Sequence, residues 1–131
     1  MANLTISAIR PVSVIAQSSG PAAEAISAGQ YVRLNTTNGK VELGNGTTAA
    51  EARKGGLALG AAATGETVTF VRKGIVEVGN ALSALTYDDD VFLSDTDGTL
   101  ADAAGTVSLI VGTVEAAWGA TTADKLLRLD L

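Results

Sequence analysis

The stretch "AISAGQYVRLNTTNGKVE", residues 25–42, decides the fold because a later stretch of the chain repeats its pattern. That later stretch is "ALTYDDDVFLSDTDGTLA", residues 84–101, which begins 59 positions further on and aligns without a gap. In each stretch, a short aliphatic run is followed by a five-residue polar turn and then by a second aliphatic run. Such runs on either side of a glycine-containing turn are typical of a β-hairpin. We therefore predict two related strand-turn-strand repeats.

The two predicted turns, "NTTNG" at 35–39 and "SDTDG" at 94–98, have different side chains in the same pattern. Each ends in an Asn-Gly or Asp-Gly pair, which readily adopts the positive φ that hairpin turns need. Because Asn38 stands where the second turn has Asp97, the turn does not require a carboxylate. We therefore interpret Asp95 and Asp97 as turn residues on a solvated surface.

The acidic residues around the second turn also raise the question of a calcium site. An EF-hand loop that used Asp95 and Asp97 would have its first ligand at Leu93 and its last at Ala104, and neither residue can bind calcium. A looser site on Asp88–Asp90 is the alternative. We predict that the chain has no metal site and needs no cofactor.

Further short runs rich in β-branched residues surround the two repeats, and turn-forming residues separate them at short intervals. This spacing favours a β-sandwich or β-barrel, so we predict an all-β fold. One short helix is expected in "TTAAEARKGG", residues 47–56. There Thr48 and Glu51 have the spacing of a capping box, alanines favour a helix, and Gly55 would end it.

The first 24 residues differ from the rest, since they contain both prolines of the chain, Pro11 and Pro21. We predict an extended N-terminal arm over residues 1–24 and a β domain over residues 25–131. The alternative is that Leu4–Ile9 adds an edge strand to the sheet.

Apolar residues of this arm are the candidate contacts to a partner. They are interrupted too often for a regular helix, but they suit an extended strand that adds to the edge of a partner's sheet. Trp118 could either pack inside the protein or anchor an interface. The candidate interface residues are Leu4, Ile6, Ile9, Pro11, Val12, Val14, Ile15 and Trp118.

The composition excludes several functions. The chain has no cysteine and no histidine, which removes thiolate metal sites, cysteine nucleophiles and imidazole bases, and we predict that it is not an enzyme. A net charge of −5 without a basic stripe disfavours nucleic-acid binding. No apolar run approaches the roughly 20 residues that span a membrane, and the start lacks the basic region of a signal peptide. We expect a soluble protein that is made in a cytoplasm.

Four segments together resemble the capsid decoration (cement) proteins of tailed bacteriophages. They are "AISAGQYVRLNTTNGKVEL", "GLALGAAATGETVTFVRKGIVEVGNAL", "DVFLSDTDGTL" and "LIVGTVEAA", and the resemblance covers about residues 22–131. The second repeat departs from the pattern, because Asp88 or Asp89 stands where the first repeat has Gly29. The N-terminal arm is the part that matches least.

This resemblance implies a small β-barrel or β-tulip domain without catalytic activity. The protein would bind the major capsid protein on the outer surface of the expanded capsid and stabilise the virion, as a homotrimer made in the host bacterial cytoplasm. An N-terminal arm would reach the capsid or a neighbouring subunit. The alternatives are another phage structural module, such as a head-fibre base, tail tube or adhesin, or a carbohydrate-binding module that uses Tyr87 and Trp118.

Overall fold

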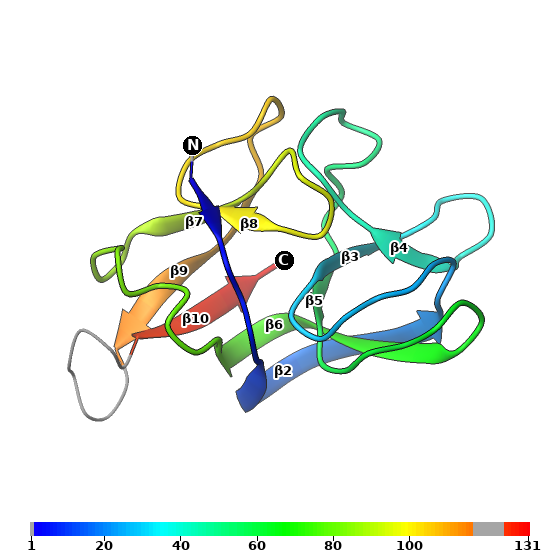
Figure 1. Ribbon diagram of the computed structural model, residues 1–131, viewed down its shortest axis with the longest axis horizontal. Coiled ribbons are helices and arrows are strands. Elements are labelled where there is room, and N and C mark those ends of the chain that lie inside the picture. Colours follow the sequence, from blue (N-terminus) through cyan, green and yellow to red (C-terminus); the bar gives the residue numbers. More distant parts are fainter. Residues whose placement is uncertain (1, 117–124) are drawn as a thin grey trace.

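The computed structural model describes residues 2–116 and 125–131, and every regular element in these two ranges is a β-strand. The predicted all-β class is confirmed, and Figure 1 shows one sheet that curls into a half-barrel. The strands are β1 (Asn3–Leu4), β2 (Arg10–Pro21), β3 (Tyr31–Leu34), β4 (Val41–Leu43), β5 (Gly56–Ala58), β6 (Thr67–Glu77), β7 (Asp90–Leu93), β8 (Leu100–Ala101), β9 (Ile110–Ala116) and β10 (Lys125–Asp130).

The predicted short helix is wrong. The carbonyl of Thr48 accepts hydrogen bonds from Glu51 N at 3.2 Å and Ala52 N at 2.9 Å, which makes a single turn and no more. Tyr31 then holds the chain, because its hydroxyl donates to Arg53 O and accepts from Gly55 N. Helix nucleation is costly, and two or three favourable residues cannot extend a turn against such tertiary contacts.

The two predicted hairpins form with corresponding pairs. Arg33 pairs with Glu42 between β3 and β4. Phe92 pairs with Ala101 between β7 and β8, and each of these two residues lies 59 positions after its counterpart in the first hairpin. After the first hairpin, β5 pairs with β3 and β6 pairs with β5. After the second hairpin, β9 pairs with β7 and β10 pairs with β9. The two four-strand units, β3–β6 and β7–β10, therefore follow the same order of pairing, and they join where β6 meets β10.

The sheet forks at β6, the strand at its centre. One edge of β6 pairs with β2 along its whole length. The other edge pairs with β5 at Phe70 and Val71 and with β10 from Lys73 to Val76. Gly74, with φ of 144°, lies just beyond the fork. A Cβ atom there would lie 2.2 Å from Ser13 O, so only glycine lets β2 pass this close.

Two hydrophobic clusters fill the described part of the chain, and the larger draws residues from both units. The larger packs β7–β10 against residues of β3, β5 and β6, and the smaller packs the first hairpin against the chain that follows β2. The larger cluster includes Leu4, Tyr31, Leu57, Val71, Val76, Leu82, Val91, Leu93, Val111, Leu127 and Leu129. The smaller contains Ala22, Ile26, Val32, Val41, Ala58, Ala62, Val68 and Phe70.

The N-terminal residues connect two separate edges of this sheet. β1 pairs with β8, residues 5–9 cross the open side of the half-barrel, and β2 then pairs with β6 (Figure 1). Ile6 and Ile9 pack against the larger cluster as the chain crosses. One continuous segment therefore spans the gap between the β8 edge and the β6 edge.

Candidate interaction surface

β2 is the most exposed strand of the fold, although it is also one of the longest. None of its 12 residues is buried, and Ile15, with 72% of its surface exposed, is its most prominent apolar side chain. One edge forms ten registered pairs with β6, while the other edge has no partner strand in the described ranges. Residues 12–20 carry no charge. An uncharged free edge is a template for pairing with another chain, since charged residues normally block such contacts.

The structure separates the candidate interface residues into groups. Leu4 is 9% exposed and belongs to the larger cluster, and Ile6 and Ile9 are partly buried against it, so these three face inward. Pro11, Val12, Val14 and Ile15 all lie on β2. Trp118 lies outside the described residues.

β2 follows β6 irregularly. The register shifts between Pro11 and Ser13, between Val14 and Ala16, and between Ala16 and Gln17. Extra residues of this kind bend a strand and increase its twist. The bends lie beside Gly74, where β6 itself changes partner.

A second surface adjoins β2 on the solvent side of β6, β9 and β10, and we call it the outer face. Three ion pairs cross it, which is three of the four in the described part of the chain. They are Arg10–Glu77 at 2.5 Å, Lys73–Asp130 at 3.1 Å and Arg128–Glu115 at 3.8 Å. The partly buried Ile75 lies between Lys73 and Glu77 on β6 and opposite Arg128 on β10.

The outer face is hollowed on both sides of β10. A hollow of about 450 Å³ reaches Ile15 on β2, and one of about 410 Å³ reaches Ile110 on β9. Both are lined by Arg128 and Asp130. The alternation of "RKGIVEV" and "RLDL" indicates that these residues share a face of their own strand. That β6 and β10 lie side by side is a tertiary fact, and for this reason sequence analysis missed the surface.

The carboxylates of the second turn are hydrogen-bonded within the protein. Asp95 accepts from Thr106 N at 2.8 Å and from Thr106 Oγ1 at 2.7 Å, and Asp97 accepts from Asn45 Nδ2 at 2.6 Å. These bonds tie the turn to two neighbouring loops. No three acidic side chains come together as metal ligands in residues 2–116 and 125–131.

Asp89 is the second-unit carboxylate whose pKa is shifted. Its side chain accepts a hydrogen bond from Thr86 N at 2.9 Å. Hydrogen bonds from Thr86 stabilise the charged form and lower the pKa of Asp89, and the positive charge of Lys125 lowers it a little further.

Tyr87, a candidate sugar platform, is 43% exposed beside a buried lysine. Lys125 Nζ lies 5.3 Å from the centroid of the Tyr87 ring and donates to the carbonyls of Ser83 and Leu85. The ammonium group therefore stabilises the loop before β7 through hydrogen bonds. It also lies over the Tyr87 ring, on a face that a sugar would need for stacking.

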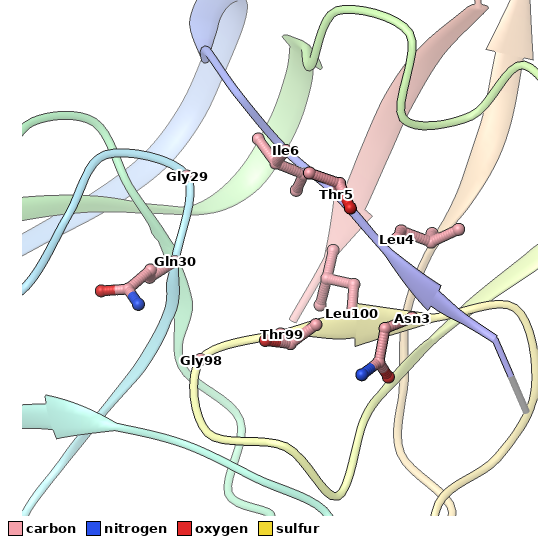
Figure 2. Close-up of a pocket in the computed structure, with 9 residues that line it drawn as sticks. All are labelled: Asn3, Leu4, Thr5, Ile6, Gly29, Gln30, Gly98, Thr99 and Leu100. Atoms are coloured by element: carbon pink, nitrogen blue, oxygen red, sulfur yellow. The ribbon is translucent and has the colours of Figure 1, made fainter.

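A third hollow, of about 330 Å³, lies between the N-terminal segment and the two hairpins, and Figure 2 shows the residues that line it. Its nine lining residues are apolar or neutral polar, and none of them can exchange a proton near pH 7. Ile6 bounds it against Gly29, where a Cβ atom would lie 2.6 Å from Ile6 Cγ2. The hollow is a seam where the N-terminal segment meets the domain.

No protein-family model, curated protein or solved structure matches this chain. The described residues also contain no helix that is long and apolar enough to cross a membrane.

Proposed function

We propose that this protein is a structural component of a tailed-bacteriophage virion that binds the outer surface of the expanded capsid and stabilises it. Its partners would be the major capsid protein and further copies of itself, assembled as homotrimers. The observation that carries the proposal is the free edge of β2, which is uncharged over residues 12–20. The sequence resemblance to capsid decoration proteins supports the same function.

β2 suits strand addition by a partner. A capsid segment that pairs with its outer edge would gain main-chain hydrogen bonds, while Val14 and Ile15 would provide apolar contacts. β6 already holds β2 in an extended conformation through ten pairs. Binding would therefore need little further ordering of this chain, which favours affinity.

Stabilisation of the capsid follows from preferential binding. A ligand that binds only one of two states stabilises that state by mass action. A protein that bridges capsid subunits at the spacing of the expanded lattice would therefore oppose its disruption. The many copies on one shell would compensate for a weak individual contact.

The test uses purified protein with mature capsids that lack it and with unexpanded procapsids. We expect co-sedimentation with mature capsids and a higher capsid disruption temperature. The variant Val14→Lys/Ile15→Lys should lose binding, because it places two charges on the free strand. Leu34→Lys, at a residue 37% exposed in the first hairpin, is the matched control and should bind normally.

Equal binding to both capsid forms, or saturation of mature capsids without a rise in disruption temperature, would refute this function. Labelled microscopy that places the protein on the tail would favour a tail-tube or adhesin module. Binding on a glycan array would favour a carbohydrate-binding module.

A further inference from the structure

We infer that a basic corner of the first unit binds an acidic segment of a protein partner. The basic corner consists of Arg53 and Lys54, both exposed in the chain just before β5, and of the partly buried Arg72 on β6. This inference rests on the proposed function, in which the partner is the capsid surface. It adds the chemistry that the partner offers beside the strand that pairs with β2.

Local contacts bring the three residues of the basic corner together. Arg72 Nη2 donates to Lys54 O at 3.3 Å, and the Arg72 guanidinium lies 6.0 Å from the centroid of the Phe70 ring. Tyr31 holds the neighbouring residue, because its hydroxyl donates to Arg53 O. The backbone of the corner is therefore held in place before a partner arrives, which reduces the loss of chain freedom on binding.

No cation of the basic corner has a carboxylate oxygen within 4.0 Å in the described part of the chain. A carboxylate of a partner therefore need not displace an existing ion pair. Arginine binds carboxylates through parallel hydrogen bonds from its planar guanidinium group, and lysine adds a compact positive charge. The three side chains together suit a segment that carries more than one carboxylate.

Three acidic groups adjoin the basic corner. Glu51 accepts a hydrogen bond from a threonine hydroxyl at 3.0 Å, and Asp130 pairs with Lys73 at 3.1 Å. The carboxylate of Leu131 follows a main-chain bond from Leu131 N to Arg72 O. With Lys73 included, four positive and three negative charges lie in this region. Positive charge is therefore in excess even when every one of these neighbours is counted.

The charge of the whole chain favours docking through this corner. Residues 25–79, which contain the first unit, have six basic and four acidic residues, so their net charge is +2. Residues 80–131, which contain the second unit, have two basic and nine acidic residues, so their net charge is −7. An acidic partner surface is therefore attracted to the first unit and repelled by the second, which selects one orientation.

The basic corner is close enough to β2 for one partner to contact both. β6 pairs with β2 on one edge and with β5 on the other, so β2 and β5 lie two strand spacings apart, about 10 Å. A standard interface covers about 800 Å² of each partner, which is wider than this separation. A partner that adds a strand to β2 can therefore place an acidic segment at the corner.

A protein segment fits this corner better than a nucleic acid does. Nucleic-acid binding normally uses a basic stripe on a strongly basic domain, whereas this corner has three cations within an acidic chain. An extended polyanion would also meet the carboxylates of the second unit. A short acidic segment needs to contact only the corner.

Fluorescence polarisation with labelled decapeptides and the full chain, without capsids, tests the inference. The probe peptide alternates glutamate with glycine, and its control has glutamine in place of glutamate. At about 20 mM salt, where screening is weak, we expect the protein to bind the glutamate peptide and not the glutamine peptide. Binding should weaken as the salt concentration rises to about 150 mM.

The variant Arg53→Gln/Lys54→Gln should weaken binding of the glutamate peptide about three- to tenfold, because it removes two exposed charges of the corner. The matched control, Arg10→Gln/Lys40→Gln, changes the net charge equally at exposed positions outside the corner and should have a much smaller effect. Because all four positions are exposed, both variants should melt close to the wild type, which thermal melting checks.

Equal binding of the two peptides, or equal effects of the two double variants, would overturn the inference. Tighter binding of a labelled single-stranded oligonucleotide than of the glutamate peptide would assign the corner to nucleic acid and would also overturn it. Capsid binding that persists without peptide binding would refute this inference alone. Peptide binding at the corner without capsid binding would refute the proposed function and leave the acidic preference intact.

Discussion

The two hairpins have the same pairing, but their surroundings differ. Leu34 pairs with Val41 and Leu93 pairs with Leu100, at equivalent positions. Leu34 is nevertheless 37% exposed, whereas Leu93 is fully buried in the larger cluster. A local pattern therefore produces the same strand pair twice without determining what covers it.

The tips of the two hairpins also differ in how far they are exposed to solvent. Residues 36–40 of the first turn are all exposed to solvent. The second turn is held by the loop after β4, where Gly46 N donates to Ser94 O at 2.7 Å and Gly98 N donates to Gly44 O at 2.8 Å. The first unit thus supports the second, which receives more contacts than its own sequence pattern indicates.

The largest expected difference concerns the two leucines. Leu93→Ala should lower the free energy of unfolding by about 2–5 kcal/mol, because it leaves a cavity in the core. Leu34→Ala should cost less than about 1 kcal/mol, because its side chain already contacts water. Chemical denaturation of both variants measures this, and equal losses would show that the two environments do not differ as described.

The second prediction compares the residues that begin β3 and β7, Tyr31 and Asp90. Burial raises the pKa of Tyr31 to about 12, although a hydrogen bond from Gly55 and the charge of Arg72 oppose the shift. The folded protein therefore favours the neutral phenol. Its contribution to stability should be complete below pH 10 and decline as the pH rises toward 12.

Tyr31→Phe should remove this alkaline dependence. It should also cost about 1–3 kcal/mol at neutral pH, since the hydroxyl bonds both Arg53 O and the buried Gly55 N. Asp90→Asn, at an exposed equivalent position, should change neither quantity appreciably. Denaturation at several pH values compares the variants, and an unaltered alkaline profile in Tyr31→Phe would contradict the assignment.

The third prediction compares the turn glycines. Gly39 and Gly98 have φ of 71° and 66°, so alanine at either position should cost about 1 kcal/mol in backbone strain. A Cβ atom at Gly39 would meet open space, but at Gly98 it would lie 3.0 Å from Leu43 Cδ2 and 3.3 Å from Gln30 Cβ. Gly98→Ala should therefore lower the melting temperature more, and the reverse order would refute the difference in packing.

The smallest effect concerns the turns that precede the hairpins. Gln30 Oε1 accepts from Ser27 N at 2.7 Å, and Asp89 Oδ2 accepts from Thr86 N at 2.9 Å, at positions 59 apart. Only the second acceptor can titrate. Because the folded protein lowers the pKa of Asp89, its contribution should be present above pH 3.8 and be lost as the pH falls through the lower folded value.

Asp89→Asn should therefore flatten the acid branch of the stability profile slightly, while Gln30→Glu should introduce a new acid-dependent contribution. Thermal melting between pH 2 and pH 6 measures both variants. Identical acid branches in Asp89→Asn and the wild type would mean that the Thr86 bond does not favour the charged carboxylate.

The hairpins could be predicted because their determinants are local. Gly39 and Gly98 supply the turn conformation, and the residues on either side alternate in hydrophobicity. Gly29 of the first repeat and Asp88 at the equivalent position of the second also share a positive φ, of 86° and 67° respectively. The helix prediction failed because the Thr48–Glu51 pattern describes only how a helix starts, while Tyr31, 17 residues earlier than Thr48, decides where the chain goes next.

The candidate site could be predicted only in part. The sequence indicated that residues 1–24 are extended and apolar, but not that Leu4 enters the core while Ile15 faces solvent. These two residues belong to similar local patterns, so periodicity cannot separate them. The outer face was missed because its ion pairs join strands up to 67 positions apart in the sequence.

The sequence by itself determined the all-β class, the two hairpins and the absence of cysteine and histidine chemistry, since each depends on composition or on neighbouring residues. Only the tertiary structure decided that β6 pairs with β2, β5 and β10. It also decided that the loop after β4 forms hydrogen bonds with the second turn. It also gathered three ion pairs on the outer face. The physical reason is that edge pairing and charge placement depend on which distant strands become neighbours, and burial of the whole apolar surface settles that choice.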